Sequence, residues 1–192
     1  MKKYRINEIF QSIQGEGYWS GIKANFIRFS GCNLNCTFCD TKHGSFTSLT
    51  EIDILEKLDK NIKIVILTGG EPTLQIDNNL LCCLRDAGYN LHLETNGTNL
   101  LENYQKFDWI TVSPKMTGKF NLRVGDEIKL LSVFIPSMPF YEDHGKFSYW
   151  WLMPTATAKN NNISEEEIKN SIVSLRPPWR LGCQIHRAYK LR

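Results

Sequence analysis

The sequence predicts an α/β fold built on a mainly parallel sheet, and two observations support that prediction. Apolar and β-branched runs of strand length alternate along the chain with segments of helical periodicity. Strands that alternate with helices pair in parallel, and functional loops then leave the C-terminal ends of the strands. Since 192 residues without an internal repeat or a linker suit a single core, we expect one domain over residues 1–192.

The expected elements follow in chain order. Strands are predicted near 26–30, 63–67, 90–94, 109–113, 127–131 and 148–152, and helices near 50–60, 73–87 and 164–175. Thr50, with Asp53 three residues later, predicts the N-cap of the first helix. Ser164 and the three glutamates after it predict the start of the third. The segment 136–147 is expected to be irregular, and 160–162 to be a loop tip.

Composition limits the function classes. The chain is 42% hydrophobic and 22% charged, as is usual for a soluble globular protein, and no apolar run approaches the roughly 18–20 residues that span a bilayer. Arg5 and Glu8 interrupt the N-terminal segment before a signal peptide could form. A net charge of +3 is too small to indicate nucleic acid. We expect a cytoplasmic protein with no membrane or nucleic-acid partner, and a small anionic ligand remains open.

The stretch "GCNLNCTFCDT" holds three cysteines, Cys32, Cys36 and Cys39, at the spacing C-x3-C-x2-C. Iron–sulfur clusters are bound by thiolates, and three ligands on a four-iron cluster leave one iron open. That iron can chelate the amino and carboxylate groups of a molecule such as S-adenosylmethionine (SAM). A structural zinc site usually has four protein ligands. The alternative is therefore a three-cysteine zinc site that His43 or Asp40 completes.

The other cysteines carry no such pattern. Cys82 and Cys83 lie in a predicted helix that ends at Gly88, so we expect small core or half-exposed residues. Cys183 is isolated in the sequence and is interpreted as structural or incidental. A chain of this size does not need disulfides to hold its core, so the six thiols indicate a reducing compartment.

Polar residues follow several predicted strands. In "TGGEP", Gly69 and Gly70 would let a ligand approach the backbone, and Glu71 offers a carboxylate to an ammonium group. The segments "LHLETNGT" and "WITVSPK" end in the same way, with Glu94, Thr95, Asn96, Ser113 and Lys115. Such repetition indicates a ligand-lined mouth, although each residue alone could belong to a turn or a helix cap.

Together these motifs resemble a known family. The cysteine loop followed by GGEP is similar to the radical SAM superfamily. Within it, "IFQSIQGEGYWSG", "FIRFSGCNLNCTFCDT", "TGGEP", "ETNG" and "VSPK" resemble the 7-carboxy-7-deazaguanine synthase family over residues 8–130. The resemblance implies a partial (β/α) barrel of about six mainly parallel strands, usually as a homodimer. It implies conversion of 6-carboxy-5,6,7,8-tetrahydropterin to 7-carboxy-7-deazaguanine with loss of ammonia, in queuosine and 7-deazapurine biosynthesis.

The same resemblance implies the cofactors and partners. A [4Fe–4S] cluster on Cys32, Cys36 and Cys39 would be catalytic, SAM would be a recycled cofactor, and Mg2+ would be required. Thr41 matches the position of the family's Mg2+ ligand, and oxygen ligands suit this hard cation. An electron donor such as flavodoxin or ferredoxin would reduce the cluster.

Residue chemistry suggests how a carboxylated pterin would bind. Gln14 and Glu16 suit a pyrimidinone edge, because a carboxylate accepts from adjacent N–H groups and an amide both donates and accepts. They could instead form a polar turn between strands. Arg28 lies in the middle of a predicted strand, where a cation needs a partner. A substrate carboxylate could bind its guanidinium bidentately, or Glu94 could form an internal salt bridge with it.

Transfer of the family pattern, residue by residue, completes the candidate site. SAM would contact Phe38, Cys39, Asp40, Gly70, Glu71, Ser113, Pro114, Lys115, Met153 and Pro154. The substrate would contact Ile13, Gln14, Gly15, Glu16, Arg28, Thr68, Gln184 and His186. Met153 stands where the family often has the glutamine of a Gln-Pro pair. Contact with adenine through the backbone and the thioether would still work.

Two rival functions share part of this pattern. A radical SAM activase, which makes a glycyl radical on a partner protein, would share the cysteine loop and GGEP. It would not need the IQGEG segment or Arg28. A non-enzymatic module that binds a cluster or zinc would leave the polar strand ends without a role. The combined motifs favour the synthase.

Overall fold

The computed structural model describes residues 2–39, 44–155 and 164–191. Its strands are β1 (Tyr4–Ile13), β2 (Lys23–Phe29), β3 (Thr47–Leu49), β4 (Ile64–Gly69), β5 (Asn90–Thr95), β6 (Trp109–Val112), β7 (Val124–Leu131), β8 (Lys146–Met153) and β9 (Trp179–Leu181). Its α-helices are α1 (Glu51–Glu56), α2 (Asn78–Asp86), α3 (Met138–His144), α4 (Glu165–Val173) and α5 (Ile185–Ala188). Short 3-10 turns are η1 (Pro72–Leu74), η2 (Tyr104–Lys106), η3 (Thr117–Lys119) and η4 (Ser132–Ser137).

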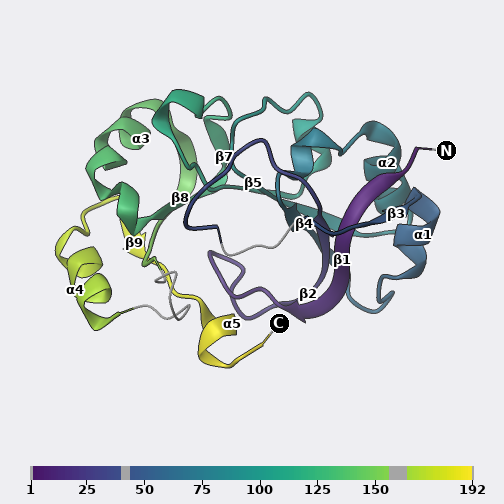
Figure 1. The fold of residues 1–192 in the computed structure, drawn as a ribbon, viewed down its shortest axis with the longest axis horizontal. Helices are drawn as coiled ribbons and strands as arrows, with labels where there is room; N and C mark the ends of the chain where they lie inside the picture. The colour runs from purple at the N-terminus through teal and green to yellow at the C-terminus, as the bar shows by residue number, and fades with distance from the viewer. Residues whose placement is uncertain (1, 40–43, 156–163, 192) are drawn as a thin grey trace.

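In the described part of the chain, nine strands form one sheet in the order β3-β1-β2-β4-β5-β6-β7-β8-β9. Neighbours from β2 to β9 are parallel, whereas β1 is antiparallel to both β2 and β3. The sheet curves into an incomplete ring, with α1 to α4 on its outside (Figure 1). The predicted α/β class and partial barrel are therefore confirmed. The six predicted strands are β2 and β4 to β8, and the sheet adds β1, β3 and β9 to them.

The predicted helix starts are confirmed by their caps. The Asp53 N–H donates to Thr50 Oγ1 at 3.2 Å, and the Thr50 N–H donates to the Asp53 carboxylate at 2.8 Å, which is a capping box. At the start of α4 the Glu167 N–H donates to Ser164 Oγ at 3.1 Å. Local side-chain chemistry thus places both helices where the sequence predicts them.

Two expectations were wrong. The helix expected over 73–87 is divided into η1 and α2, because Asp77 caps a new helix by accepting the Leu80 N–H at 3.1 Å. The segment 136–147 is not irregular but contains α3, whose first turn tolerates Pro139 because the amide there needs no partner. The loop tip expected at 160–162 lies outside the described residues.

The two faces of the sheet differ in character. Alternate strand residues face the helices and form the main apolar core, as Leu67 and Leu93 do, and both are fully buried. Their neighbours Thr68 and Glu94 face the inside of the barrel instead. No described helix is both long and apolar enough to cross a membrane.

The connection from β1 to β2 (residues 14–22, the plug loop) lies within the ring of strands in Figure 1. Its base is fixed by two hydrogen bonds, from the Gln14 N–H to the Ile22 carbonyl and from the Gly21 N–H to the Gln14 carbonyl, both 2.8 Å. Its Tyr18 ring stacks on Trp109 at the first residue of β6, with centroids 5.0 Å apart. The plug loop thus covers the N-terminal side of the barrel and leaves the C-terminal side for a ligand.

Candidate active site

A cavity of about 850 Å³ opens at the C-terminal ends of the parallel strands, a volume typical of small-molecule sites. It brings together most of the predicted site residues: Ile13, Gln14, Gly15, Glu16, Arg28, Cys32, Cys36, Phe38, Cys39, Thr68, Gly70, Ser113, Lys115, Met153, Pro154, Gln184 and His186. Among the described candidates, Glu71 and Pro114 do not line it. Asp40 and Thr41 lie outside the described residues, as does His43.

The three motif cysteines lie on the loop that follows β2, and all three line the cavity as free thiols. A turn holds two of them together, since the Cys39 N–H donates to the Cys36 carbonyl at 3.1 Å. The Asn96 amide points to Cys32 Sγ at 3.8 Å. Burial raises the pKa of Cys36, and Lys115 opposes this while the neighbouring thiols add to it. The loop therefore presents its sulfurs as a group beside a cation.

The two glycines of TGGEP lie in close contact with other backbone atoms of the chain. A Cβ on Gly70 would lie 2.0 Å from the Gly31 carbonyl oxygen, and one on Gly69, at φ +124°, would lie 2.3 Å from the Phe29 carbonyl oxygen. The Gly70 N–H donates to the Phe29 carbonyl at 3.0 Å. The close backbone approach that the sequence predicted for a ligand is therefore made by the chain itself. These glycines let the start of the cysteine loop pack against the end of β4.

The predicted ammonium-binding role of the Glu71 carboxylate does not fit the geometry. Glu71 is fully buried, and its oxygens accept from Thr73 N–H at 3.1 Å, Thr73 Oγ1 at 2.6 Å, Thr95 Oγ1 at 2.7 Å and Asn96 N–H at 2.8 Å. Because protein donors occupy both oxygens, this carboxylate fixes the turns after β4 and β5 from behind the cavity.

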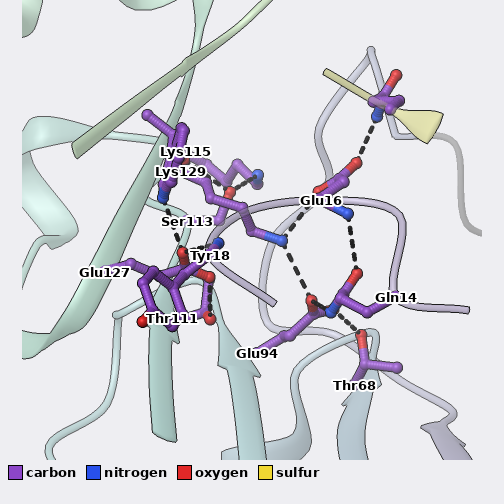
Figure 2. A network of polar contacts seen from close by, with 12 residues as sticks. Gln14, Glu16, Tyr18, Thr68, Glu94, Thr111, Ser113, Lys115, Glu127 and Lys129 are labelled. Carbon is purple, nitrogen blue, oxygen red and sulfur yellow. Dashed lines mark hydrogen bonds and ion pairs between the residues drawn. The ribbon is translucent and has the colours of Figure 1, made fainter. Parts of the chain in front are cut away.

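The centre of the cavity wall is an ionic network around Lys129 (Figure 2). Lys129 Nζ, on β7, donates to Glu16 Oε2 at 2.9 Å and to Glu94 Oε1 at 3.1 Å. Gln14 Nε2 and Thr68 Oγ1 also donate to the Glu94 carboxylate, at 3.0 Å and 2.8 Å. The plug loop and the ends of three strands therefore meet in one hydrogen-bonded set.

Charge pairing keeps this network ionised. Burial alone would raise the pKa values of Glu16 and Glu94, but Lys129 outweighs it, so the pKa of Glu16 falls to about 2 and that of Glu94 is also lowered. Against the lowering effect of burial, the two carboxylates raise the pKa of Lys129. The side chains of Glu16 and Glu94 stay 20% and 23% exposed, against 7% for Lys129. A ligand would thus meet two carboxylates with the cation behind them.

Arg28 is paired with Glu8, and the salt bridge to Glu94 considered from the sequence was wrong. Arg28 Nε donates to Glu8 Oε1 at 2.8 Å across the β1–β2 pair, and the guanidinium lies over the Phe10 ring at 5.6 Å. Glu94 forms its salt bridge with Lys129 instead. Arg28 lines the cavity and its side chain is 23% exposed, so a ligand in the cavity could reach this side chain.

The side of the cavity opposite Arg28 is built by the ends of β6 and β8. Lys115 Nζ donates to Ser113 Oγ at 2.7 Å, and Ser113 Oγ donates to the Lys129 carbonyl at 3.0 Å. Met153 is buried, and its sulfur lies against Gly182, where a Cβ would be only 2.1 Å from Sδ. This packing holds the thioether at the wall of the cavity.

The segment before and within α5 lies against the plug loop. The Ile185 N–H donates to the Gly15 carbonyl at 2.9 Å, and Gln184 Nε2 donates to Glu16 Oε1 at 2.5 Å. A Cβ on Gly15 would lie 1.9 Å from His186 Nδ1, so the imidazole rests directly on this glycine. Gln184 Oε1 is buried and accepts no hydrogen bond from the described residues. A ligand N–H could occupy that acceptor.

Three charged residues of the barrel interior were not among the predicted site residues: Glu8, Glu127 and Lys129. Glu127 and Lys129 alternate with Ile128 and Leu130, so "DEIKLL" could be taken as an ordinary strand with one solvated face. The signal that could have found the last two is their spacing, because residues two apart in a strand share a face. Two opposite charges on the same face of a strand indicate that this face is buried and that its charged groups have polar partners.

Comparison with known proteins identifies the family. The model of the Radical SAM superfamily matches residues 26–126. A 7-carboxy-7-deazaguanine synthase from Bacteroides thetaiotaomicron is 40% identical over 98% of this chain and 98% of its own length. The chain belongs to the 7-carboxy-7-deazaguanine synthase family. A synthase from Neisseria meningitidis is 34% identical over 96% of this chain and 92% of its own length. The crystal structure of QueE from Escherichia coli superposes with a TM-score of 0.75 at 27% identity, covering 94% and 93% of the two chains.

As a member of this synthase family, the chain is a radical SAM enzyme of queuosine biosynthesis that uses a [4Fe–4S] cluster and SAM. The donor set fits the cluster. In the part of the chain that the structure describes, no three thiol, imidazole or carboxylate groups converge on a single metal position. A four-iron cluster does not require that convergence, because each thiolate binds a different iron. The zinc alternative depends on Asp40 or His43, which the described ranges leave out.

Proposed function

We propose that the enzyme converts 6-carboxy-5,6,7,8-tetrahydropterin to 7-carboxy-7-deazaguanine with loss of ammonia. One observation supports this most directly: the cysteine loop and the Gln14–Glu16 turn, which come from different strand connections, line the same cavity. A cluster-bound cofactor and a ligand held by that turn would therefore be neighbours. We also propose that residues 1–192 act as one domain, in keeping with the single sheet.

The carboxylate pair supports recognition of the pyrimidinone half of a pterin. Glu16 and Glu94 stay ionised over the physiological range because Lys129 lowers their pKa values. Ionised carboxylates accept from adjacent N–H groups, such as those of a 2-amino-pyrimidinone. The unused acceptor of Gln184 could take another N–H of the same ring. Ile13, Gly15, Thr68 and His186 would complete this wall of the pocket.

The other half of the substrate would meet a cation. The Arg28 guanidinium is held in place by Glu8 and keeps further N–H groups for a carboxylate. Mg2+ bound at Thr41 would join the same carboxylate, a ligand that hard cations prefer. The carboxyl-bearing carbon would then lie between the cysteine loop and the turn.

SAM would occupy the side of the cavity nearest the cysteines. We assign its binding to Phe38, Cys39, Asp40, Gly70, Ser113, Pro114, Lys115, Met153 and Pro154. For Glu71 we propose that only the backbone takes part, since its carboxylate is fully engaged with protein donors. The buried thioether of Met153 offers an apolar face to adenine.

The cofactors, when bound, supply the 5′-deoxyadenosyl radical that removes one hydrogen from the substrate carbon bearing the carboxylate. The residues of this chain position that carbon. The ionic contacts at opposite ends of the pterin fix its orientation, and precise placement is the main protein contribution to such chemistry. The plug loop, which covers the N-terminal side of the barrel, would exclude water from that side of the bound pterin.

The partners follow from the same proposal. An electron donor such as flavodoxin or ferredoxin would reduce the cluster, and the active form would be a homodimer. We place the enzyme in the cytoplasm, where its six thiols would stay reduced.

The test is anaerobic reconstitution with iron and sulfide, followed by incubation with dithionite, SAM, Mg2+ and the carboxy-tetrahydropterin. Mass spectrometry should detect 7-carboxy-7-deazaguanine without stoichiometric 5′-deoxyadenosine. A Cys36→Ala variant is the matched control and should form neither product. Accumulation of 5′-deoxyadenosine with no deazaguanine would overturn the substrate assignment and favour an activase.

A further inference from the structure

Glu127 lies inside the barrel on β7, one layer below Lys129 and away from the cavity (Figure 2). The residue is 3% exposed. Its carboxylate accepts from the Tyr18 N–H at 2.8 Å, from Trp151 Nε1–H at 2.8 Å and from Thr111 Oγ1–H at 2.7 Å. A buried carboxylate is costly unless donors surround it, so these three contacts account for its presence. One of them reaches out of the sheet to the plug loop.

Gly17 shows how closely the plug loop is seated on this carboxylate. Its φ is +70°, and a Cβ there would lie 2.5 Å and 2.6 Å from the two Glu127 oxygens. On the other side of the turn, Gly15 meets the His186 ring in the same way. Glu16 stands between the two glycines and is paired with Lys129. The Gly-Glu-Gly turn is therefore held from both sides while its carboxylate faces the cavity.

Tyr18 connects the rest of the turn to Glu127. Tyr18, whose amide binds Glu127, has its ring 4.5 Å from Tyr149 and 5.0 Å from Trp109. The Tyr18 side chain also hydrogen-bonds Tyr149, so this bond and the amide-to-carboxylate bond to Glu127 together set the height of the turn in the barrel. Gln14 and Glu16 lie two to four residues before that amide. A shift of Tyr18 would act first on Glu16, since Gln14 is also held by its backbone bonds with Ile22 and Gly21.

We propose that Glu127 is a positioning residue for substrate recognition: through the Tyr18 amide it sets the place of the turn that presents Gln14 and Glu16. This inference rests on the proposed function of that turn in binding the pterin. Glu127 touches neither substrate nor cofactor in this arrangement. Its effect is exerted on pterin affinity, and SAM binding does not depend on it.

Two substitutions separate geometry from charge. Glu127→Gln keeps one carbonyl oxygen for Tyr18 and Trp151, and its amide can donate to the Thr111 hydroxyl, so the turn should stay in place. Glu127→Met fills the space without accepting any hydrogen bond. The matched control is Asp126→Asn, because Asp126 accepts the Ile110 N–H at 2.7 Å on the outer side of the same strand.

The first measurement is hydrogen–deuterium exchange of the peptide containing residues 14–22 in the protein without cofactors. We expect faster exchange in Glu127→Met and wild-type exchange in Glu127→Gln and Asp126→Asn. The second is steady-state kinetics of the reconstituted enzyme. Glu127→Met should raise KM for the pterin about 10- to 100-fold with a smaller change in kcat, and SAM cleavage without pterin should be unchanged.

If Glu127→Met does not fold, Gly17→Ala tests the same contact from the loop side, since its Cβ would push the turn off the carboxylate. Wild-type exchange and wild-type KM in the folded variant would overturn the proposal, as would equal losses in Glu127→Gln and Asp126→Asn. Failure of the proposed function is recognised separately. The wild-type enzyme would then make no deazaguanine, and the role of Glu127 in pterin recognition would be overturned with it.

Discussion

The barrel interior contains two sets of carboxylates, one at the cavity and one behind it, that are stabilised in different ways. In the layer facing the cavity, Glu16 and Glu94 share the cation of Lys129. In the layers behind it, Glu127 and Glu71 accept only from neutral donors, namely amides, hydroxyls and an indole. The carboxylates at the cavity therefore bind the Lys129 ammonium directly, whereas those behind it are held by hydrogen-bond dipoles, with the Lys129 charge also acting on Glu127.

The difference has a physical reason. A carboxylate surrounded by several neutral donors has no remaining capacity for a ligand and serves as a fixed anchor. Glu16 and Glu94 also accept from neutral side chains, but both reach the cavity and the Lys129 ammonium keeps them charged, so they can still receive ligand N–H groups. Access to the cavity together with a direct ammonium partner thus distinguishes recognition carboxylates from structural ones.

The strongest test of this contrast is Lys129→Met. Removing the cation leaves Glu16 and Glu94 as adjacent buried charges, and breaking such a set costs about 3–5 kcal/mol of unfolding free energy. Product formation should be lost, because at least one carboxylate would protonate and stop accepting N–H groups. Denaturant unfolding and the product assay measure both effects. Wild-type turnover in this variant would show that the cavity-facing network does not take part in substrate recognition.

The N-terminal side of the barrel interior, under the plug loop, can be tested through pH. His92 is buried beside Trp19, and burial lowers its pKa from 6.5 to about 4, against the opposing influence of Asp108 and Glu94. Between these two pH values the unfolded chain binds the proton that the folded chain does not, so unfolding free energy falls as pH falls. The loss should be about 1.4 kcal/mol per pH unit.

The control for this effect is His92→Gln, which has no titrating ring. Its unfolding free energy, followed by urea denaturation from pH 7 to pH 4, should change less than that of the wild type. Parallel curves for the two proteins would mean that His92 becomes protonated within the fold. The stability that carboxylate pairing contributes in the cavity layer is present above the ordinary Glu16 pKa of 4.5 and is lost mainly below this range, as pH falls toward the folded pKa of about 2.

A smaller stability effect is expected for Arg28→Lys. The Arg28–Glu8 pair is about a quarter exposed on both side chains, so its loss should change unfolding free energy by less than about 1 kcal/mol. An ammonium cannot reproduce two parallel contacts with a carboxylate, and KM for the pterin should rise about tenfold. Thermal unfolding measures the stability change, and steady-state kinetics measures the change in KM. A large stability loss with unchanged KM would make Arg28 a structural residue like Glu71.

The smallest effect should come from Lys169→Met. Lys169 pairs with Glu165 at 2.8 Å on α4, and the two side chains are 69% and 83% exposed. Exposed pairs four residues apart on a helix are worth about 0.3–0.5 kcal/mol. Thermal unfolding should therefore be nearly unchanged, and activity equal to wild type. A loss similar to that of Lys129→Met would show that exposure does not distinguish these two ion pairs.

Sequence reasoning recovered the parallel strands and the helix caps from local periodicity and capping residues, whereas most of the cavity lining came from the resemblance to the synthase family. It missed Lys129 and Glu127 for a reason of topology. Alternation of charged and apolar residues predicts a solvated face on an open sheet, but curvature turns that face inward. It also missed α3, because Pro139 near a helix start looks the same in sequence as a helix breaker.

The contact between Glu16 and Gln184 joins residues 168 positions apart. Pairings of such long range are slow to form, since a long loop must be closed before they stabilise anything. During synthesis the three thiols of the cysteine loop leave the ribosome well before Gln184 is made. A growing chain would therefore display its iron ligands while one wall of the pocket is still missing, and the delivery of iron and sulfide could precede closure of the pocket.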